Sequence, residues 1–265
     1  MRLVYLCVVC LLALSVTAGA ATVNLTMDNL TAQGWKVTAT NVYGDTFDAS
    51  VAQTTEHGVG DFMFYTGEMP DTWEFQWAGI STNAFSGTRL ASITSVKIRT
   101  LGHDGREDNW QPSTFIWVVD KGDGNHRCVL WKPWSNGNPR EPAVWHEHNA
   151  AVTGQWFVEE TGRYCNSLID LKAALPNAFF VDTGALPLDW GYASQHAFNV
   201  GNCPLYDADR SWFSRVTGHV DWFEIGVSGS VTRYDLGVGE PIPEPGSLVG
   251  LAAGLLGLTA FRRRK

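Results

Sequence analysis

The sequence lacks the short motifs that mark common classes of enzyme. It has no Gly-x-Ser-x-Gly turn, no His-Glu-x-x-His pair and no P-loop. It also has no Cys-x-x-Cys pair, so we expect no structural zinc site. These absences leave no catalytic constellation with a recognisable spacing, so we expect a protein that is not an enzyme.

Basic residues are scarce between the two ends of the chain. Of the 19 Lys and Arg residues, Arg2 and the four cations at 262–265 belong to the end segments, which leaves 14. Of the 27 acidic residues only Glu244 lies there, which leaves 26 and a net charge near −12. Because a nucleic-acid-binding protein needs a basic face, this balance excludes nucleic acid as a partner.

Cysteines are few as well. Cys7 and Cys10 lie in an N-terminal apolar run, and three others remain. An odd number permits one disulfide and leaves one thiol. Cys165 and Cys203 both sit in turn-rich sequence, whereas Cys128 lies in an apolar run, so we predict a Cys165–Cys203 disulfide and a packed Cys128 thiol.

The N-terminus has the three parts of a secretory signal. Met1 and Arg2 give a positive start, residues 3–16 are almost entirely apolar, and Ala18-Gly19-Ala20 offers small residues to a peptidase. A retained anchor helix would need roughly 20 apolar residues, which is longer than this run. We therefore predict a signal peptide over residues 1–20, removed by signal peptidase during export.

The C-terminus also has three elements in order. Pro243-Glu244-Pro245 is followed by an apolar stretch from Leu248 to Phe261 and then by Arg262-Arg263-Arg264-Lys265. The terminal cations should stay in the cytoplasm, which leaves Pro-Glu-Pro just outside the membrane, within reach of a membrane protease. An ordinary tail anchor is the alternative, but it has no need of the Pro-Glu-Pro.

This tail resembles the PEP-CTERM sorting segment of Gram-negative bacteria. The resemblance implies recognition by an exosortase-type membrane protease and removal of the helix. It further implies delivery to the cell surface, the outer membrane or the extracellular matrix, where exopolysaccharide is a candidate partner. The membrane would be contacted only through the tail, before processing.

Strand patterns dominate the sequence between the two ends. The continuous apolar run Thr114-Phe115-Ile116-Trp117-Val118-Val119 is typical of a strand buried on both faces. Gly, Asn and Asp residues mark turns at 122–125 and 135–138. The other strand candidates are residues 35–40, 62–65, 93–99, 127–131, 155–159, 179–181 and 219–227.

One helix is predicted among these strands. Asn166 or Ser167 can cap it, Asp170 lies in its first turn, and Pro176-Asn177 ends it. Its apolar stripe is Leu168, Ile169, Leu171 and Leu175. Many strands with one short helix predict an all-β fold, a two-sheet antiparallel sandwich of jelly-roll type.

The segments predict one β-sandwich domain over residues 21–236, a linker over 237–242 and the tail over 243–265. The order of elements in residues 93–227 resembles uncharacterised jelly-roll modules of secreted bacterial proteins. It is carried by an Asp/Gly turn at 120–125, a helix ending at Ala173–Ala178 and the strand Gly218-His219-Val220-Asp221. The resemblance implies the fold and no particular activity.

Tryptophan is the most unusual component, at 12 residues. Core packing is the ordinary role of such large rings. Trp110, Trp131 and Trp134 lie in polar surroundings, however, where exposed indoles could stack on sugar rings while polar neighbours bind hydroxyl groups. Carbohydrate binding by these three residues and packing are the two alternatives.

Two groups of residues are candidate metal ligands, although no cofactor is required by the sequence. Asp120, Asp123 and Asn125 offer oxygen atoms across a Gly-containing turn, as calcium prefers, but the spacing is not that of an EF-hand loop, which favours a plain hairpin turn. His146 and His148 should share one face of a strand, without an evident third ligand.

These features together predict an exported surface or exopolysaccharide-associated protein that is not an enzyme and that binds carbohydrate through exposed Trp residues. The alternative is an extracellular glycan-cleaving enzyme on the same fold, which needs two carboxylates across a cleft. Glu159-Glu160 and Glu224 are the acids that could be considered for it.

Overall fold

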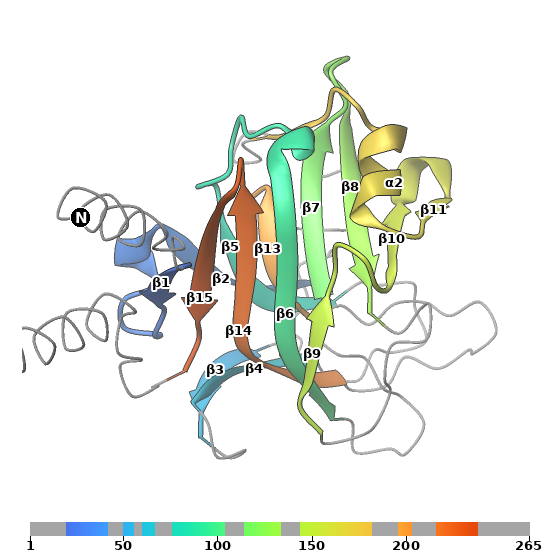
Figure 1. Ribbon diagram of the computed structural model, residues 1–265. Helices are drawn as coiled ribbons and strands as arrows, with labels where there is room; N and C mark the ends of the chain where they lie inside the picture. The colour runs from blue at the N-terminus through green and yellow to red at the C-terminus, as the bar shows by residue number, and fades with distance from the viewer. Residues whose placement is uncertain are drawn as a thin grey trace, which may run out of the picture.

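The computed structural model describes residues 20–41, 50–55, 60–66, 76–103, 114–133, 144–181, 196–202 and 216–237. Within these ranges the chain forms two β-sheets and one short α-helix (Figure 1). The predicted mostly-β fold with two sheets is therefore confirmed. No helix in the described ranges is long and apolar enough to cross a membrane.

The seven-stranded sheet, called sheet A here, is built around β14. Its strands are β1 (Ala21–Asn24), β3 (Ser50–Thr54), β4 (Asp61–Thr66), β6 (Ile93–His103), β9 (His146–Asn149), β14 (Val216–Val227) and β15 (Ser230–Asp235). β6 follows one edge of β14 and carries β9, while β4 and β15 share the other edge. The register of β14 against β6 shifts between Val220 and Trp222, so Asp221 is the extra residue of a β-bulge. On the opposite edge of β14, the pairing with β4 ends at Val220 and the pairing with β15 begins at Trp222.

The eight-stranded sheet, sheet B, has β7 near its middle. Its strands are β2 (Trp35–Asn41), β5 (Gln76–Thr82), β7 (Thr114–Asp120), β8 (His126–Lys132), β10 (Gln155–Val158), β11 (Arg163–Cys165), β12 (Phe179–Phe180) and β13 (Phe198–Asn202). The order is β11-β10-β8-β7-β13-β5-β2, and β12 pairs with the end of β7 beyond β13. All of these pairs are antiparallel.

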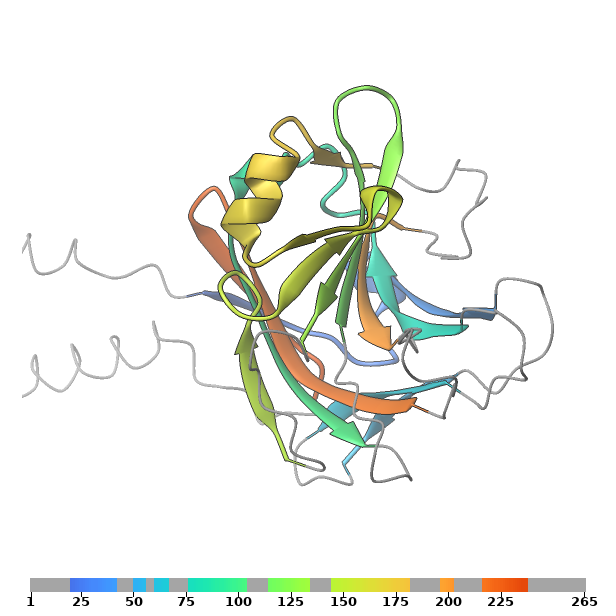
Figure 2. The same ribbon diagram turned by 90° about the vertical axis from the view of Figure 1, so that its right-hand side faces the viewer.

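The two sheets lie face to face, and sheet A is curled. Figure 2 shows β14 and β6 bending strongly along their length, so that sheet A wraps partly around sheet B. The expectation of a wholly antiparallel sandwich is wrong at one place, because β1 pairs with β15 in parallel. This pairing joins segments about 210 residues apart, which no local pattern reports.

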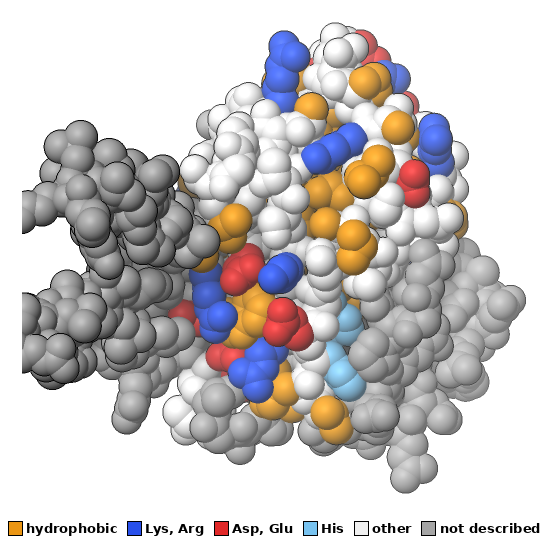
Figure 3. All heavy atoms as spheres, in the orientation of Figure 1, with side chains coloured by type: hydrophobic (Ala, Val, Ile, Leu, Met, Phe, Trp, Pro, Cys, Tyr) orange, Lys and Arg blue, Asp and Glu red, His pale blue; other side chains and the backbone are white. Residues whose placement is uncertain are grey.

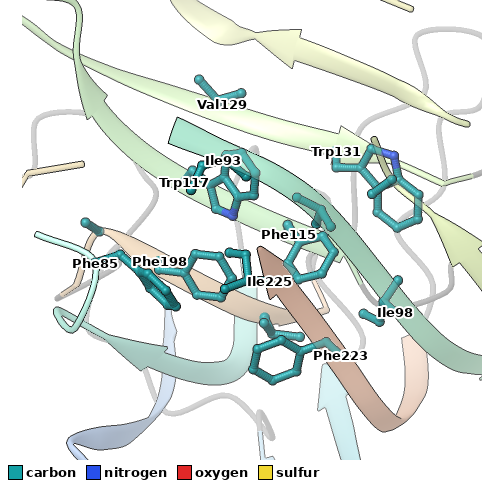
Figure 4. Close-up of a cluster of buried hydrophobic side chains, with 14 of the residues drawn as sticks. Phe85, Ile93, Ile98, Phe115, Trp117, Val129, Trp131, Phe198, Phe223 and Ile225 are labelled. Carbon is teal, nitrogen blue, oxygen red and sulfur yellow. The ribbon is translucent and has the colours of Figure 1, made fainter. Parts of the chain in front are cut away.

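The core between the sheets is aromatic (Figure 4). Phe198 of β13 lies against Trp117 of β7 with ring centroids 5.8 Å apart, and against Phe223 of β14 at 6.1 Å. Phe115 contacts Phe223 at 6.2 Å, so rings of both sheets touch directly. The predicted strand at 114–119 is buried on both faces, as its continuous apolar sequence indicated.

The predicted helix is α2 (Leu168–Ala174), which packs beside β11. Ser167 is its N-cap, and the Ser167 hydroxyl accepts a hydrogen bond from the backbone N–H of Asp170. Leu168 and Leu171 are buried, as predicted. Ile169 is not part of the buried stripe, since 73% of its surface is exposed.

Candidate functional site

The outer face of sheet B carries a row of apolar side chains that runs across its strands. Ile116 pairs with Leu130, Leu130 with Phe157, and Phe157 with Tyr164, so the four residues occupy successive strands from β7 to β11 at one level. Ile116 and Leu130 are buried, and they pack with Trp77 of β5 in a cluster separate from the main core. The row becomes progressively more exposed towards β11.

The exposed end of this row forms an aromatic platform. Tyr164 is 51% exposed, and its ring lies 4.8 Å from that of Phe157. The Lys132 ammonium sits 4.5 Å from the Phe157 ring centre and 5.0 Å from the Tyr164 ring centre, and it donates a hydrogen bond to the Tyr164 hydroxyl oxygen at 3.1 Å. These contacts hold the phenol ring in one orientation at the surface.

Polar groups border the platform. Gln155 of β10 donates its side-chain N–H to the Asn166 side-chain oxygen at 3.0 Å, at an exposed position. Gln155 and Phe157 share the outer face of β10, since they are two residues apart in a strand. We call Lys132, Gln155, Phe157, Tyr164 and Asn166 together the Tyr164 platform. An exposed ring beside amide and ammonium groups can stack on an apolar face of a ligand while binding its oxygen atoms.

The predicted sugar-stacking role of Trp131 is not supported, because this side chain is buried. Trp131 has no exposed surface, and its indole N–H donates to the Thr153 carbonyl oxygen at 2.9 Å. Alternation along β8 places Trp131 on the core face and its neighbour Lys132 on the outer face. Trp110 and Trp134 lie outside the described residues.

The proposed calcium ligands belong to the turn between β7 and β8. The Asp120 carboxylate oxygen Oδ1 accepts hydrogen bonds from the backbone N–H groups of Gly122, Asp123 and Gly124, at 2.6, 3.1 and 3.1 Å. Both glycines have positive φ, which allows the tight turn. These contacts are those of a hydrogen-bonded hairpin turn, the alternative to calcium that the sequence left open.

Asp123 in the same turn is paired with a cation. Its carboxylate lies 2.9 Å from the Lys121 ammonium, and it accepts a hydrogen bond from the Asn125 N–H at 3.0 Å. The hydrogen bond with Lys121 lowers the pKa of Asp123 from 3.8 to about 2. In the described part of the chain no three His, Cys, Asp or Glu side chains gather to hold a metal ion.

His146 and His148 lie on one face of β9, as the sequence predicted. They pair with Thr100 and Ile98 of β6, respectively, so both face the space between the sheets. His148 is almost completely buried, and its ring lies 6.0 Å from that of His146. Burial first, and the nearby His146 second, lower the pKa of His148 to about 4.

One member of the predicted Cys165–Cys203 disulfide, Cys203, lies outside the described residues. Cys165 is a buried thiol without a disulfide partner among the described residues, and burial is the main cause that raises its pKa. The pairing with Cys203 therefore stays a prediction.

The acids considered for a glycosidase are not brought together by the described strands. Glu160 follows β10 in sheet B and forms an ion pair with Arg127. Glu224 lies on β14 in sheet A, 3.7 Å from the Lys97 ammonium. Glu160 and Glu224 therefore belong to different sheets, and each forms an ion pair with a cation of its own sheet.

The outer face of sheet A carries mixed charges (Figure 3). Arg99 of β6 contacts Asp221 of β14 at 2.5 Å, and Arg233 of β15 contacts Asp235 at 3.0 Å while lying over the Trp222 ring. Burial raises the pKa of Asp221, and Arg99 opposes that effect. Because these charges neutralise one another, this face is a weaker candidate for ligand binding than the Tyr164 platform.

Comparison with known protein families identifies the tail. Residues 241–265 match the PEP-CTERM protein-sorting motif. The chain therefore carries a C-terminal PEP-CTERM motif, which implies export, processing by an exosortase and sorting to the cell surface. The sorting residues Pro243, Glu244 and Pro245 and the arginines at 262–264 lie within this match and outside the described residues.

The match covers the tail and leaves the two sheets unassigned. No curated protein is similar in sequence to this chain. The sequence did not predict the Tyr164 platform, because Gln155 is followed by three apolar residues, Trp156-Phe157-Val158, and such a run does not show which side chain faces outward.

Proposed function

We propose that this exported protein binds extracellular polysaccharide through the Tyr164 platform and does not cleave it. Its two sheets would form a sandwich of jelly-roll type, retained at the cell surface, outer membrane or extracellular matrix of a Gram-negative bacterium. One observation carries the proposal: Tyr164 is half exposed, and contacts with the Phe157 ring and the Lys132 ammonium hold its ring in place.

The platform has the chemistry that a sugar ring requires. A pyranose presents C–H groups on one face and hydroxyl groups around its edge, so it pairs with an aromatic ring flanked by polar groups. The Lys132 ammonium has three N–H donors and uses one on the Tyr164 hydroxyl, which leaves donors for sugar oxygens. Gln155 and Asn166 add amide groups at an exposed edge.

The fixed ring also reduces the cost of binding. A ligand loses affinity when it must first order a flexible side chain, at about 0.5–1.5 kcal/mol for each. The hydrogen bond and ring contacts of Tyr164 already order its side chain in the free protein, so a ligand does not have to order it. A polysaccharide would be held by many such weak contacts on neighbouring protein copies, which suits retention in a matrix.

Affinity electrophoresis of the exported protein in gels containing exopolysaccharide from the producing bacterium tests the proposal. Tyr164→Ala should weaken retention at least about tenfold, equivalent to roughly 1.4 kcal/mol. Tyr164→Phe keeps the ring and should retain most of the binding. Val37→Ala is the matched control, because it removes an exposed apolar side chain from β2, at the opposite edge of sheet B from β11. Equal retention of native protein and Tyr164→Ala would refute the proposal.

The same mixtures distinguish binding from cleavage. We expect no release of reducing ends and no fall in polymer length during prolonged incubation. Release of reducing ends by the native protein would favour the glycan-cleaving alternative. Loss of that release in Glu160→Gln or Glu224→Gln would then identify the acids involved.

A further inference from the structure

We infer that His146 and His148 form a two-histidine site for a divalent transition metal at the edge of sheet A. Both side chains project from β9 towards the space between the sheets. β9 pairs only with β6 among the described strands, so it is an edge strand and its outer side is not covered by another strand of the sheet. The inference does not depend on the proposed polysaccharide binding.

Three ring nitrogens of these two histidines are buried without a hydrogen-bond partner. His148 is 2% exposed, and neither of its ring nitrogens has a hydrogen-bond partner. Nε2 of His146 is also buried and without a partner. A buried polar atom left unpaired destabilises the folded state, so native structures rarely keep three of them on two adjacent side chains. A metal ion bound to one nitrogen of each ring would supply the missing interaction.

The spacing of the rings fits one shared ion. A metal–nitrogen bond to histidine is about 2.0–2.1 Å, and a ring centre lies roughly 1.1 Å from its nitrogens, so two imidazoles on one ion have centres roughly 5–6.5 Å apart. The centres of His146 and His148 are 6.0 Å apart. Residues two apart on a strand share a face, so the backbone presents both rings in one direction.

The surroundings of His148 restrict its ring, which is almost completely buried. Trp131 lies edge-on to the His148 ring, with centroids 5.7 Å apart, and restricts the ring on its core side. No third protein ligand joins the pair within the described ranges, so water would complete the coordination.

Imidazole ligands select the class of metal. Nitrogen donors suit Cu²⁺, Ni²⁺ and Zn²⁺, whereas calcium and magnesium require oxygen donors. Cu²⁺ binds most strongly in this series, and its unpaired electron reports how many nitrogens coordinate it. It is therefore the probe for the site.

Titration of the exported protein with Cu²⁺, followed by electron paramagnetic resonance, tests the inference. We expect one equivalent bound with two coupled imidazole nitrogens. His146→Ala and His148→Gln should each weaken binding at least tenfold and leave at most one coupled nitrogen. His126→Ala is the matched control, because His126 is an exposed histidine at the start of β8, and its binding should equal that of the native protein.

Three results would overturn the inference. The first is unchanged affinity in His146→Ala when circular dichroism shows a native fold. The second is a native spectrum with fewer than two coupled nitrogens. The third is binding that His126→Ala abolishes, which would indicate an adventitious surface site only. If His148→Gln does not fold, the half-buried His146 variant and the nitrogen count in native protein still decide the question.

Discussion

The Phe198 ring is stacked on the Trp117 indole, with centroids 5.8 Å apart and ring planes 28° from parallel. Phe198 also contacts Phe85 at 4.8 Å and Phe223 at 6.1 Å, so one side chain joins neighbouring strands of sheet B to the central strand of sheet A. It is completely buried. Its removal should therefore loosen the contact between the two sheets.

We predict that Phe198→Ala lowers the free energy of unfolding by about 3–5 kcal/mol, the usual loss for a fully buried Phe. Phe198→Leu should cost less, because it fills more of the cavity. Urea denaturation of the exported protein measures both. Ile169→Ala, at an exposed position, should change stability by less than about 0.5 kcal/mol. A loss below 1 kcal/mol for Phe198→Ala would contradict the central role of this ring.

The sequence predicted a core rich in aromatic residues, but it did not show which aromatic side chains lie in that core. Strand β8 is apolar on both faces: Val129 and Trp131 belong to the main core, whereas Cys128 and Leu130 lie with the outer cluster. A strand of this kind has no polar face to show which side is inside. The sequence therefore could not tell that Trp131 points inward and Lys132 outward.

The Tyr164 platform shows a second limit of prediction. The platform combines Tyr164 of β11, Phe157 of β10 and Lys132 of β8. Only the register between these strands brings the three side chains together. Register depends on pairing over many residues, not on local sequence. The cap of α2 was predictable, by contrast, because Ser167 and Asp170 interact within one turn.

We predict that Asp120→Ala destabilises the protein by about 1–3 kcal/mol. The substitution leaves three backbone N–H groups of the turn without their acceptor. Asp120→Asn keeps an oxygen acceptor and should cost less. Thermal unfolding in calcium and in chelator should give the same melting temperature for native protein, since the turn is complete without a cation. A rise in melting temperature with calcium that Asp120→Ala abolishes would favour the calcium site instead.

The Lys121–Asp123 pair should be visible in acid titration. Asp123 has a pKa of about 2 in the folded protein, against 3.8 for an ordinary aspartate. The unfolded chain therefore binds the proton first as pH falls, so the stabilisation from this pair is complete above about pH 4 and is lost between pH 4 and 2.

Carboxyl-carbon NMR of the native protein measures this directly. Lys121→Ala should move the Asp123 midpoint up towards 3.8, and added salt should move it in the same direction because the pair is exposed. Lys36→Ala, at an exposed position on β2, serves as the control and should leave the midpoint unchanged. An Asp123 midpoint near 3.8 in the native protein would rule out a strong interaction with Lys121.

The C-terminal motif gives the prediction with the clearest readout. Residues 241–265 match the PEP-CTERM protein-sorting motif, and exosortase processing should remove the apolar segment from Leu248 to Lys265. The cations at 262–264 should hold the end of this segment in the cytoplasm, while the prolines at 243 and 245 keep the chain extended for a protease. Replacing the three arginines with Gln should weaken this stop and reduce the amount of protein at the cell surface, whereas replacing them with Lys should preserve it. Intact-mass measurement of surface-extracted protein decides the matter, because a mass that still includes residues 248–265 would leave an uncleaved tail anchor as the explanation.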